Sequence, residues 1–242
     1  MSSRSSGVRI SLLGGFQLES GSPASILPEG SQRLLAYLAL EGRSISRQKV
    51  AATLWPVATE VHASSSLRSA LARLRGGARA SVAATARYLG LSDEVSVDLW
   101  EARELAHRLI ATKETSSEGP GSETIPALST ELLPDWYDEW ALVEAEDWRQ
   151  LRLHALEALA DRLTAQRNYG DAAAASLAAV RAEPLRESPR AALIRVHVAE
   201  GNPSEALREF SRYGELLRLE LGVEPTERLR ALVNDLWPVT QP

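Results

Sequence analysis

Residues 63–75 read ASSSLRSALARLR, and this stretch decides the fold. Leu67, Ala70, Leu71 and Leu74 recur at the spacing of one helix face, which predicts a helix with these four residues turned toward a core. The opposite face is small, hydroxylated or basic, and no carboxylate interrupts the run. The stretch is therefore either a solvated amphipathic helix or a helix that enters the major groove of DNA, where hydroxyl and guanidinium groups meet base edges and phosphates.

The segments around this helix follow the order of a winged helix. Ser46 is expected to cap the second helix, because a Ser side chain can accept a hydrogen bond from a free amide of the first turn. Residues 57–62 are expected to be a loop, and Gly76-Gly77 a plain turn. In chain order we expect strands over 8–18, helices over 29–40, 47–54 and 63–75, and short strands over 80–85, 87–91 and 95–99.

Composition indicates a globular protein of one large or two small domains. The chain has 242 residues, of which 44% are hydrophobic and 24% charged, and it has no Cys. Without Cys there is no disulfide framework, thiolate metal site or cysteine nucleophile. No apolar run approaches the roughly 20 residues of a membrane span, and residues 1–7 lack the apolar segment of a signal peptide. We expect a cytoplasmic protein with no membrane contact.

The net charge of −5 is unevenly distributed. Residues 1–98 carry 11 Lys and Arg against 7 Asp and Glu, a balance of +4, whereas residues 99–242 carry 16 against 25, a balance of −9. A basic first part joined to an acidic second part predicts two different partners. The basic part could bind a polyanion, whereas a polyanion would repel the acidic part.

The second half of the chain has helical periodicity and an internal repeat. A helix is expected over 99–111, a Ser-, Gly- and Pro-rich loop over 112–130, and consecutive helices from Trp140 onward. A period of 34 residues is that of the tetratricopeptide repeat, a stacked helix pair. Four residues recur at this offset: Leu159, Asn168, Asp171 and Ala172 match Leu193, Asn202, Glu205 and Ala206.

Several motifs resemble the Streptomyces antibiotic regulatory protein family. LPEGSQRLLAYLAL (27–40), SISRQKVAATLWP (44–56), ASSSLRSALARLR and YLGL…VSVDLW (88–100) resemble its OmpR-type winged helix. PLRE (184–187) and LGVEP (221–225) resemble the bacterial transcriptional activation domain that follows. The resemblance implies an α+β winged-helix domain over 1–98 and an all-α, tetratricopeptide-like domain over 99–242.

The resemblance also implies a function. We expect a sequence-specific DNA-binding transcriptional activator that binds promoter direct repeats as a side-by-side dimer and recruits RNA polymerase through its sigma factor or alpha subunit. One departure concerns the wing, which in the family commonly has Gly before the tyrosine, whereas Thr85-Ala86-Arg87-Tyr88 stands here. The atypical wing and the net charge of −5 leave an alternative open. In that alternative the chain is a protein-binding adaptor whose winged helix no longer reads DNA sequence.

The candidate DNA contacts combine Arg, Lys and Ser, which can bind base edges or phosphate. By helical angle Ser69 and Arg73 point most directly away from the core and are expected at bases, while Arg68 and Arg75 are expected at phosphates. The full set is Ser65, Arg68, Ser69, Arg73 and Arg75 in the third helix, Arg47 and Lys49 at the start of the second, and Arg87 in the wing.

Residues 135–148 interleave acidic with aromatic residues, and two interpretations are open. The surface could dock a basic partner, or the aromatic residues could be core and the acids solvated. No enzymatic motif is present: the four histidines lack metal-ligand spacing, and there is neither a phosphate-binding loop nor a nucleophile–base pair. We expect no enzyme, cofactor or metal.

Overall fold

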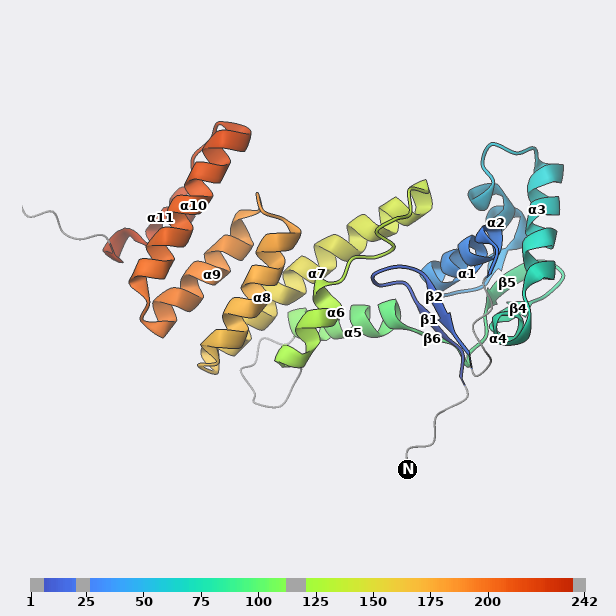
Figure 1. Cartoon of the computed structure of the whole chain (residues 1–242), viewed down its shortest axis with the longest axis horizontal. Helices are drawn as coiled ribbons and strands as arrows, with labels where there is room; N and C mark the ends of the chain where they lie inside the picture. Colours follow the sequence, from blue (N-terminus) through green and yellow to red (C-terminus); the bar gives the residue numbers. More distant parts are fainter. Residues whose placement is uncertain (1–6, 21–26, 112–120, 237–242) are drawn as a thin grey trace, which may run out of the picture. The chain divides into compact units, whose positions relative to one another are not determined.

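The computed structural model describes residues 7–20, 27–111 and 121–236, which form two compact units (Figure 1). The first unit comprises residues 1–101 together with 131–148, and the second comprises 102–130 together with 149–242. The expected division at residue 98 stays a prediction. Residues 1–6 of the expected polar tail lie outside the described residues.

Three helices build the centre of the first unit: α1 (Glu29–Glu41), α2 (Arg47–Leu54) and α3 (Glu60–Arg73). α1 is buried along most of its length and packs against α3, while α2 packs against α3 as well. α1 ends at Gly42, whose φ of 60° is the left-handed conformation that Gly adopts without strain. The predicted cap of α2 is confirmed, because Ser46 Oγ accepts from Lys49 N at 3.2 Å.

Two small sheets flank these helices. In the first, β1 (Arg9–Ser11) lies between β2 (Gln17–Glu19), to which it is antiparallel, and β6 (Ser96–Val97), to which it is parallel. In the second, β5 (Tyr88–Leu91) lies between β3 (Ile45–Ser46) and β4 (Val82–Ala84), antiparallel to both. β4 and β5 form the hairpin that the sequence predicts as the wing.

The limits of α3 differ from the prediction at both ends. The helix begins at Glu60 rather than Ala63, because Thr59 Oγ1 accepts a hydrogen bond from His62 N and caps the first turn. It ends at Arg73, since Leu74 is extended, with ψ of 134°. Arg75 therefore lies beyond the helix. The expected loop over 57–62 is correspondingly shorter.

The expected turn at Gly76-Gly77 is instead the start of a short helix, α4 (Gly76–Ala80). Gly76 has φ of 51°, a left-handed conformation that lets the chain reverse between the two helices. A Cβ on Gly77 would lie 2.3 Å from Ser20 Cβ, so only glycine allows the chain to pass Ser20 here. Both glycines thus serve the junction after α3.

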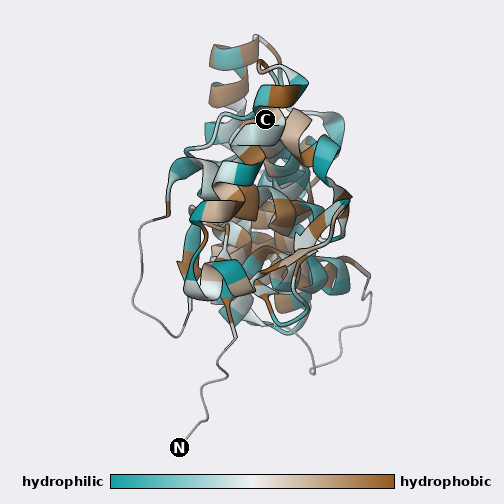
Figure 2. Cartoon of the chain, turned by 90° about the vertical axis from the view of Figure 1, so that its right-hand side faces the viewer, coloured by the Kyte–Doolittle hydropathy of each residue, from teal (hydrophilic) through white to brown (hydrophobic). Residues whose placement is uncertain are grey.

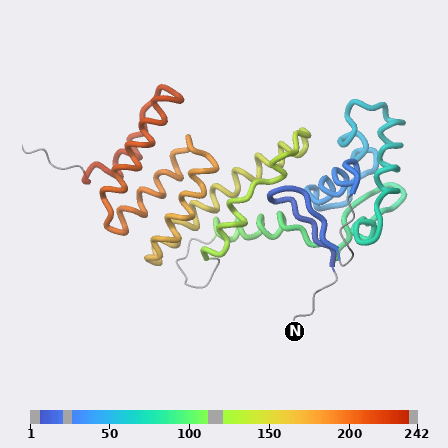
Figure 3. Tube along the Cα trace, in the orientation of Figure 1, coloured from blue at the N-terminus to red at the C-terminus, as the bar shows by residue number. Residues whose placement is uncertain are grey.

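The second unit is helical, as expected, and the residues of α5 and α7 are divided between the two units (Figures 1 and 3). α8 packs on α9, and α9 packs on α10. The helices are α5 (Asp98–Ala111), α6 (Ile125–Ser129), α7 (Glu139–Ala165), α8 (Tyr169–Ala182), α9 (Glu187–Glu200), α10 (Pro203–Leu221) and α11 (Glu227–Ala231), with 3-10 turns η1 (Ser122–Thr124) and η2 (Asn234–Leu236).

The 34-residue repeat corresponds to equivalent places in consecutive helix pairs. Asn168 precedes α8 and Asn202 precedes α10, each at the N-cap position. The matched Leu159 and Leu193 are both buried, with 0% and 2% exposure. The helix pair α7–α8 is thus followed by an equivalent pair, α9–α10, as in a tetratricopeptide-like repeat.

The expected loop over 112–130 is wrong in its second part. η1 and α6 occupy residues 122–129, with Pro126 in the first turn of α6, where a missing amide donor costs no hydrogen bond. Leu128 is fully buried, so tertiary packing outweighs the loop-like composition. Residues 112–120 of this prediction lie outside the described residues.

Hydrophilic and hydrophobic residues are mixed along the ribbons of the helices (Figure 2). Within the described ranges, none combines the length and the apolar character needed to cross a membrane.

Candidate nucleic-acid interface

One side of α3 is exposed along the whole helix and carries the predicted residues. Ser65, Arg68, Ser69 and Arg73 are all exposed. The predicted inner face is buried at Leu67, Ala70 and Leu74, with Leu71 half-buried. Because the inner face anchors the helix, its outer face is held rigidly in solvent.

The two arginines within α3 have no side-chain partner among the described residues. Among the described residues, neither Arg68 nor Arg73 takes part in a hydrogen bond or an ion pair, although surface arginines commonly pair with a nearby carboxylate. Each guanidinium group keeps its donors available for a planar acceptor pair, such as the O6 and N7 atoms of guanine, or for a phosphate.

Arg75 lies just beyond α3 and binds the end of that helix. Its Nη1 donates to the carbonyl oxygens of Ala72 and Leu74, the latter at 3.0 Å. Free carbonyls at a helix end need such partners. Arg75 therefore fixes the end of α3 and is separate from the exposed row of Ser69 and Arg73.

The residues at the start of α2 have partners as well. Arg47 donates its backbone amide to Arg87 O at 2.9 Å and its Nε to Thr85 O at 3.0 Å, which ties α2 to the wing. Lys49 Nζ lies 3.3 Å from the Glu41 carboxylate. Of these two residues, only Arg47 lies beside the wing.

The wing is a tight turn at Thr85–Tyr88. Thr85 N donates to Tyr88 O at 3.0 Å, and Thr85 Oγ1 accepts from Tyr88 N at 2.9 Å. The threonine side chain thus stabilises the turn where the family commonly has Gly before the tyrosine. Arg87 lies exposed in this turn, and its guanidinium group has no partner among the described residues.

Sequence reasoning missed the first turn of α3. Val61 and His62 are exposed, Val61 at 74%, and they extend the outer face by one turn. The signal was present, since Val61 and Ser65 are four residues apart, like Ser65 and Ser69. The same turn holds Glu60, whose carboxylate accepts from Gln48 Nε2 at 3.1 Å, so α3 does contain an acid at its start.

No metal-binding geometry is seen. Across the part of the chain that the structure describes, no three His, Asp or Glu side chains gather as metal ligands would.

Comparison with known proteins identifies the family. The family described as the bacterial transcriptional activator domain matches residues 97–236, more than half of the chain. The chain belongs to this family. Membership agrees with the resemblance drawn from PLRE and LGVEP, confirms the likeness to the Streptomyces antibiotic regulatory protein family, and makes the chain a member of a class of transcription regulators. No curated protein matches the sequence.

A solved structure supports the fold. The chain matches the structure entitled "Mycobacterium tuberculosis EmbR in complex with low affinity phosphopeptide" with a TM-score of 0.70 and 22% sequence identity. The match covers 95% of this chain and 64% of that one, so the chain spans less than two thirds of its relative's length. It confirms the expected fold, a winged helix followed by a helical domain.

Proposed function

We propose that this chain is a transcriptional activator that reads promoter DNA with the outer face of α3. The observation that carries the proposal is the pair of arginines, Arg68 and Arg73, that have no partner among the described residues and are exposed with Ser65 and Ser69 on a helix anchored by its other face. A winged helix places its third helix in the major groove. Membership of a family of transcriptional activator domains, matched over residues 97–236, supports a role in transcription for the chain.

The arginines, Ser69 and Lys49 take distinct roles in this proposal. Ser69 and Arg73 contact base edges, while Arg68 contacts phosphate beside them. Arg87 reaches the backbone or the minor groove from the wing. Arg47 contacts phosphate with the donors that Thr85 leaves free. Arg75 positions the end of α3, and Lys49 would have to exchange Glu41 for a phosphate.

The experiment is fluorescence anisotropy of the full chain against the promoter regions beside its own gene, titrated over salt, with random duplex as the control. A reader of DNA loses affinity steeply as salt rises and prefers one promoter to random duplex. Equal and weak binding to every duplex would overturn the proposal. That result would favour the adaptor, in which α3 is a scaffold face only.

Arg73→Ala tests the reading face. We expect specific affinity to fall by about 1–3 kcal/mol, with relaxed preference at one base position. Arg181→Ala is the matched control, since Arg181 is an exposed arginine of α8 without a partner among the described residues. Unchanged specific affinity in Arg73→Ala would place the reading face elsewhere.

We further propose that the helical unit recruits RNA polymerase, through its sigma factor or alpha subunit, and that two chains bind side by side on direct repeats. Helical repeat stacks generally present an extended surface to a protein. A reporter assay with a chain that ends at residue 148 tests this. We expect activation to be lost while DNA binding remains, and retained activation would move the polymerase contact out of the helical unit.

A further inference from the structure

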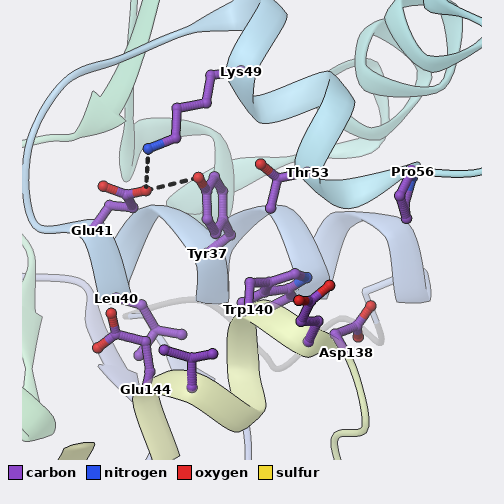
Figure 4. A pocket seen from close by; sticks show the side chains of 11 residues that line it. Tyr37, Leu40, Glu41, Lys49, Thr53, Pro56, Asp138, Trp140 and Glu144 are labelled. Atoms are coloured by element: carbon purple, nitrogen blue, oxygen red, sulfur yellow. Dashed lines mark hydrogen bonds and ion pairs between the residues drawn. The ribbon is translucent and has the colours of Figure 1, made fainter.

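A cavity in the first unit is unexplained by DNA binding. Its volume is about 480 Å³, within the range of about 300–1,000 Å³ typical of small-molecule sites. α1, α2 and the first turns of α7 line it, all within residues that form one compact unit (Figure 4).

The inner wall is aromatic and aliphatic. The rings of Tyr37 and Trp140 meet edge to face, with centroids 5.4 Å apart, beside Leu40, Pro56 and Val143. The rings of Trp136 and Trp140 also meet edge to face, with centroids 5.8 Å apart. Such a wall accepts a flat or apolar group, and its ring faces also attract a cation.

Carboxylates surround this wall. Glu41, Asp138, Glu139 and Glu144 line the cavity, against one cation, Lys49. The charge of Glu41 is met by Lys49 and Arg43, while Tyr37 also donates to it at 2.7 Å (Figure 4).

The other acids differ in their partners. Asp138 pairs with Arg33 at 2.5 Å. Glu139 has no hydrogen bond or ion pair with any described residue. The cavity thus retains an unmatched negative charge at Glu139.

A buried donor is also unsatisfied. Trp140 Nε1 is buried and has no hydrogen-bond partner among the described atoms. Because this atom has no accessible surface, a molecule in the cavity would contact the ring of Trp140 and not this donor.

From the aromatic wall and the unpaired carboxylate of Glu139 we propose that the cavity binds a small primary amine that carries an aromatic or apolar group. The ammonium pairs with Glu139, and the apolar group lies against Tyr37 and Trp140. The same cavity includes Lys49 and Thr53 of α2, which packs against α3. A bound amine would therefore touch the helix that supports the DNA-contacting helix.

Isothermal titration calorimetry of the full chain tests the site with three probes that differ by one feature each. L-Phenylalaninamide has the amine and the ring, L-alaninamide lacks the ring, and N-acetyl-L-phenylalaninamide lacks the charge. We expect saturable binding of the first, weaker binding of the second and none of the third. Failure of L-phenylalaninamide to saturate, or equal binding of the acetylated probe, overturns the proposal.

Variants locate the site. Glu139→Gln should weaken L-phenylalaninamide binding at least about tenfold, a loss of about 1.4 kcal/mol. Asp147→Asn removes the same charge from an exposed position of α7 outside the cavity and should change nothing. In NMR spectra, the indole N–H signal that Trp140→Phe removes should shift on binding. Undiminished binding in Glu139→Gln, or an unmoved Trp140 signal, would contradict the assignment.

Binding of the amine probes does not require DNA. A failure of the calorimetry experiment can therefore be told apart from a failure of the promoter-binding experiment.

Discussion

Gly77 shows how one side chain can be excluded by a neighbour far along the sequence. Because its Cβ would lie 2.3 Å from Ser20 Cβ, Gly77→Ala should force the two segments apart. Overpacking of this kind costs about 1–3 kcal/mol. Gly170→Ala is the matched control, since nothing lies within 4 Å of a Cβ there and Gly170 is in α8.

Urea unfolding measures both glycine variants. We expect Gly77→Ala to lower the free energy of unfolding of the first unit. Gly170→Ala should leave stability unchanged or raise it by up to about 1 kcal/mol, because alanine restricts the unfolded chain. Equal effects of the two changes would show that Ser20 yields easily.

Tyr37 supplies a prediction about pH. Burial, and then its hydrogen bond to Glu41, raise the pKa of Tyr37 to about 12. The unfolded chain loses this proton near pH 10. Between these values the folded state holds more protons, so the free energy of unfolding falls as pH rises from about 10 through about 12.

Absorbance at the phenolate band can follow this ionisation. Tyr37→Phe should remove a late phase near pH 12 and flatten the alkaline fall in stability. Tyr137→Phe, at an exposed position, should keep the late phase. A late phase that survives Tyr37→Phe would assign it to another tyrosine.

At the level of elements, local signals predicted α1 and α2 almost to the residue. Gly42 and Trp55-Pro56 end these helices, and Ser46 starts α2, so each boundary has a short-range physical cause. The missed elements depend on distant partners. α6 forms in a loop-like sequence because Leu128 is buried, and the parallel pairing of β1 with β6 joins residues far apart in the chain.

In the candidate interface too, local sequence signals predicted some features, and features that depend on distant residues were missed. Helical periodicity placed Ser65, Ser69 and Arg73 on the outer face and Arg68 at its flank, and all four are exposed, since exposure follows directly from the buried stripe. It misplaced Arg75, because the extended conformation of Leu74 has no periodic signature. Neither the Glu41 partner of Lys49 nor the cavity beside it has a signal in the local sequence.

The cap of α3 gives a prediction for that helix. Thr59→Ala removes the acceptor of the His62 amide and should cost about 1 kcal/mol. Thr59→Ser keeps a hydroxyl and should retain most of that stability. Hydrogen exchange at the His62 amide should speed up in Thr59→Ala alone, whereas equal exchange in both variants would mean that the cap contributes nothing.

The packing of α9 on α10 contains a buried ion pair. Arg190 pairs with Glu209, their side chains are only 12% and 9% exposed, and the Arg190 guanidinium carbon lies 5.5 Å from the centroid of the Tyr213 ring. Glu209→Ala leaves this arginine buried without its counter-charge, which costs about 3–5 kcal/mol.

A second pair on the same helix provides the control. Glu205 and Arg208 are 43% and 56% exposed, so Glu205→Ala should cost at most about 1 kcal/mol. Urea unfolding of the helical unit distinguishes the two variants. Similar losses would mean that Arg190 finds another partner once Glu209 is gone.

At the scale of the whole chain, the first unit is discontinuous in sequence. Residues 131–133 join it through backbone hydrogen bonds, Gly14 N to Glu131 O at 2.7 Å and Leu133 N to Leu12 O at 3.0 Å. Trp140 then packs on Tyr37 of α1, and Trp148 is 1% exposed. The winged helix therefore takes part of its packing from beyond residue 98, where the sequence motifs of that fold end.

Two fragments test this dependence. A chain of residues 1–98 lacks the segment from 131 to 148, whereas a chain of residues 1–148 keeps it. Because loss of one large buried aromatic side chain already costs about 3–5 kcal/mol, we expect the shorter fragment to unfold at much lower urea concentration. Adding Trp140→Ala to the longer fragment should remove part of the difference. Equal midpoints for the two fragments would instead make residues 1–98 an independent folding unit, and would support the division at residue 98 that the motifs predict.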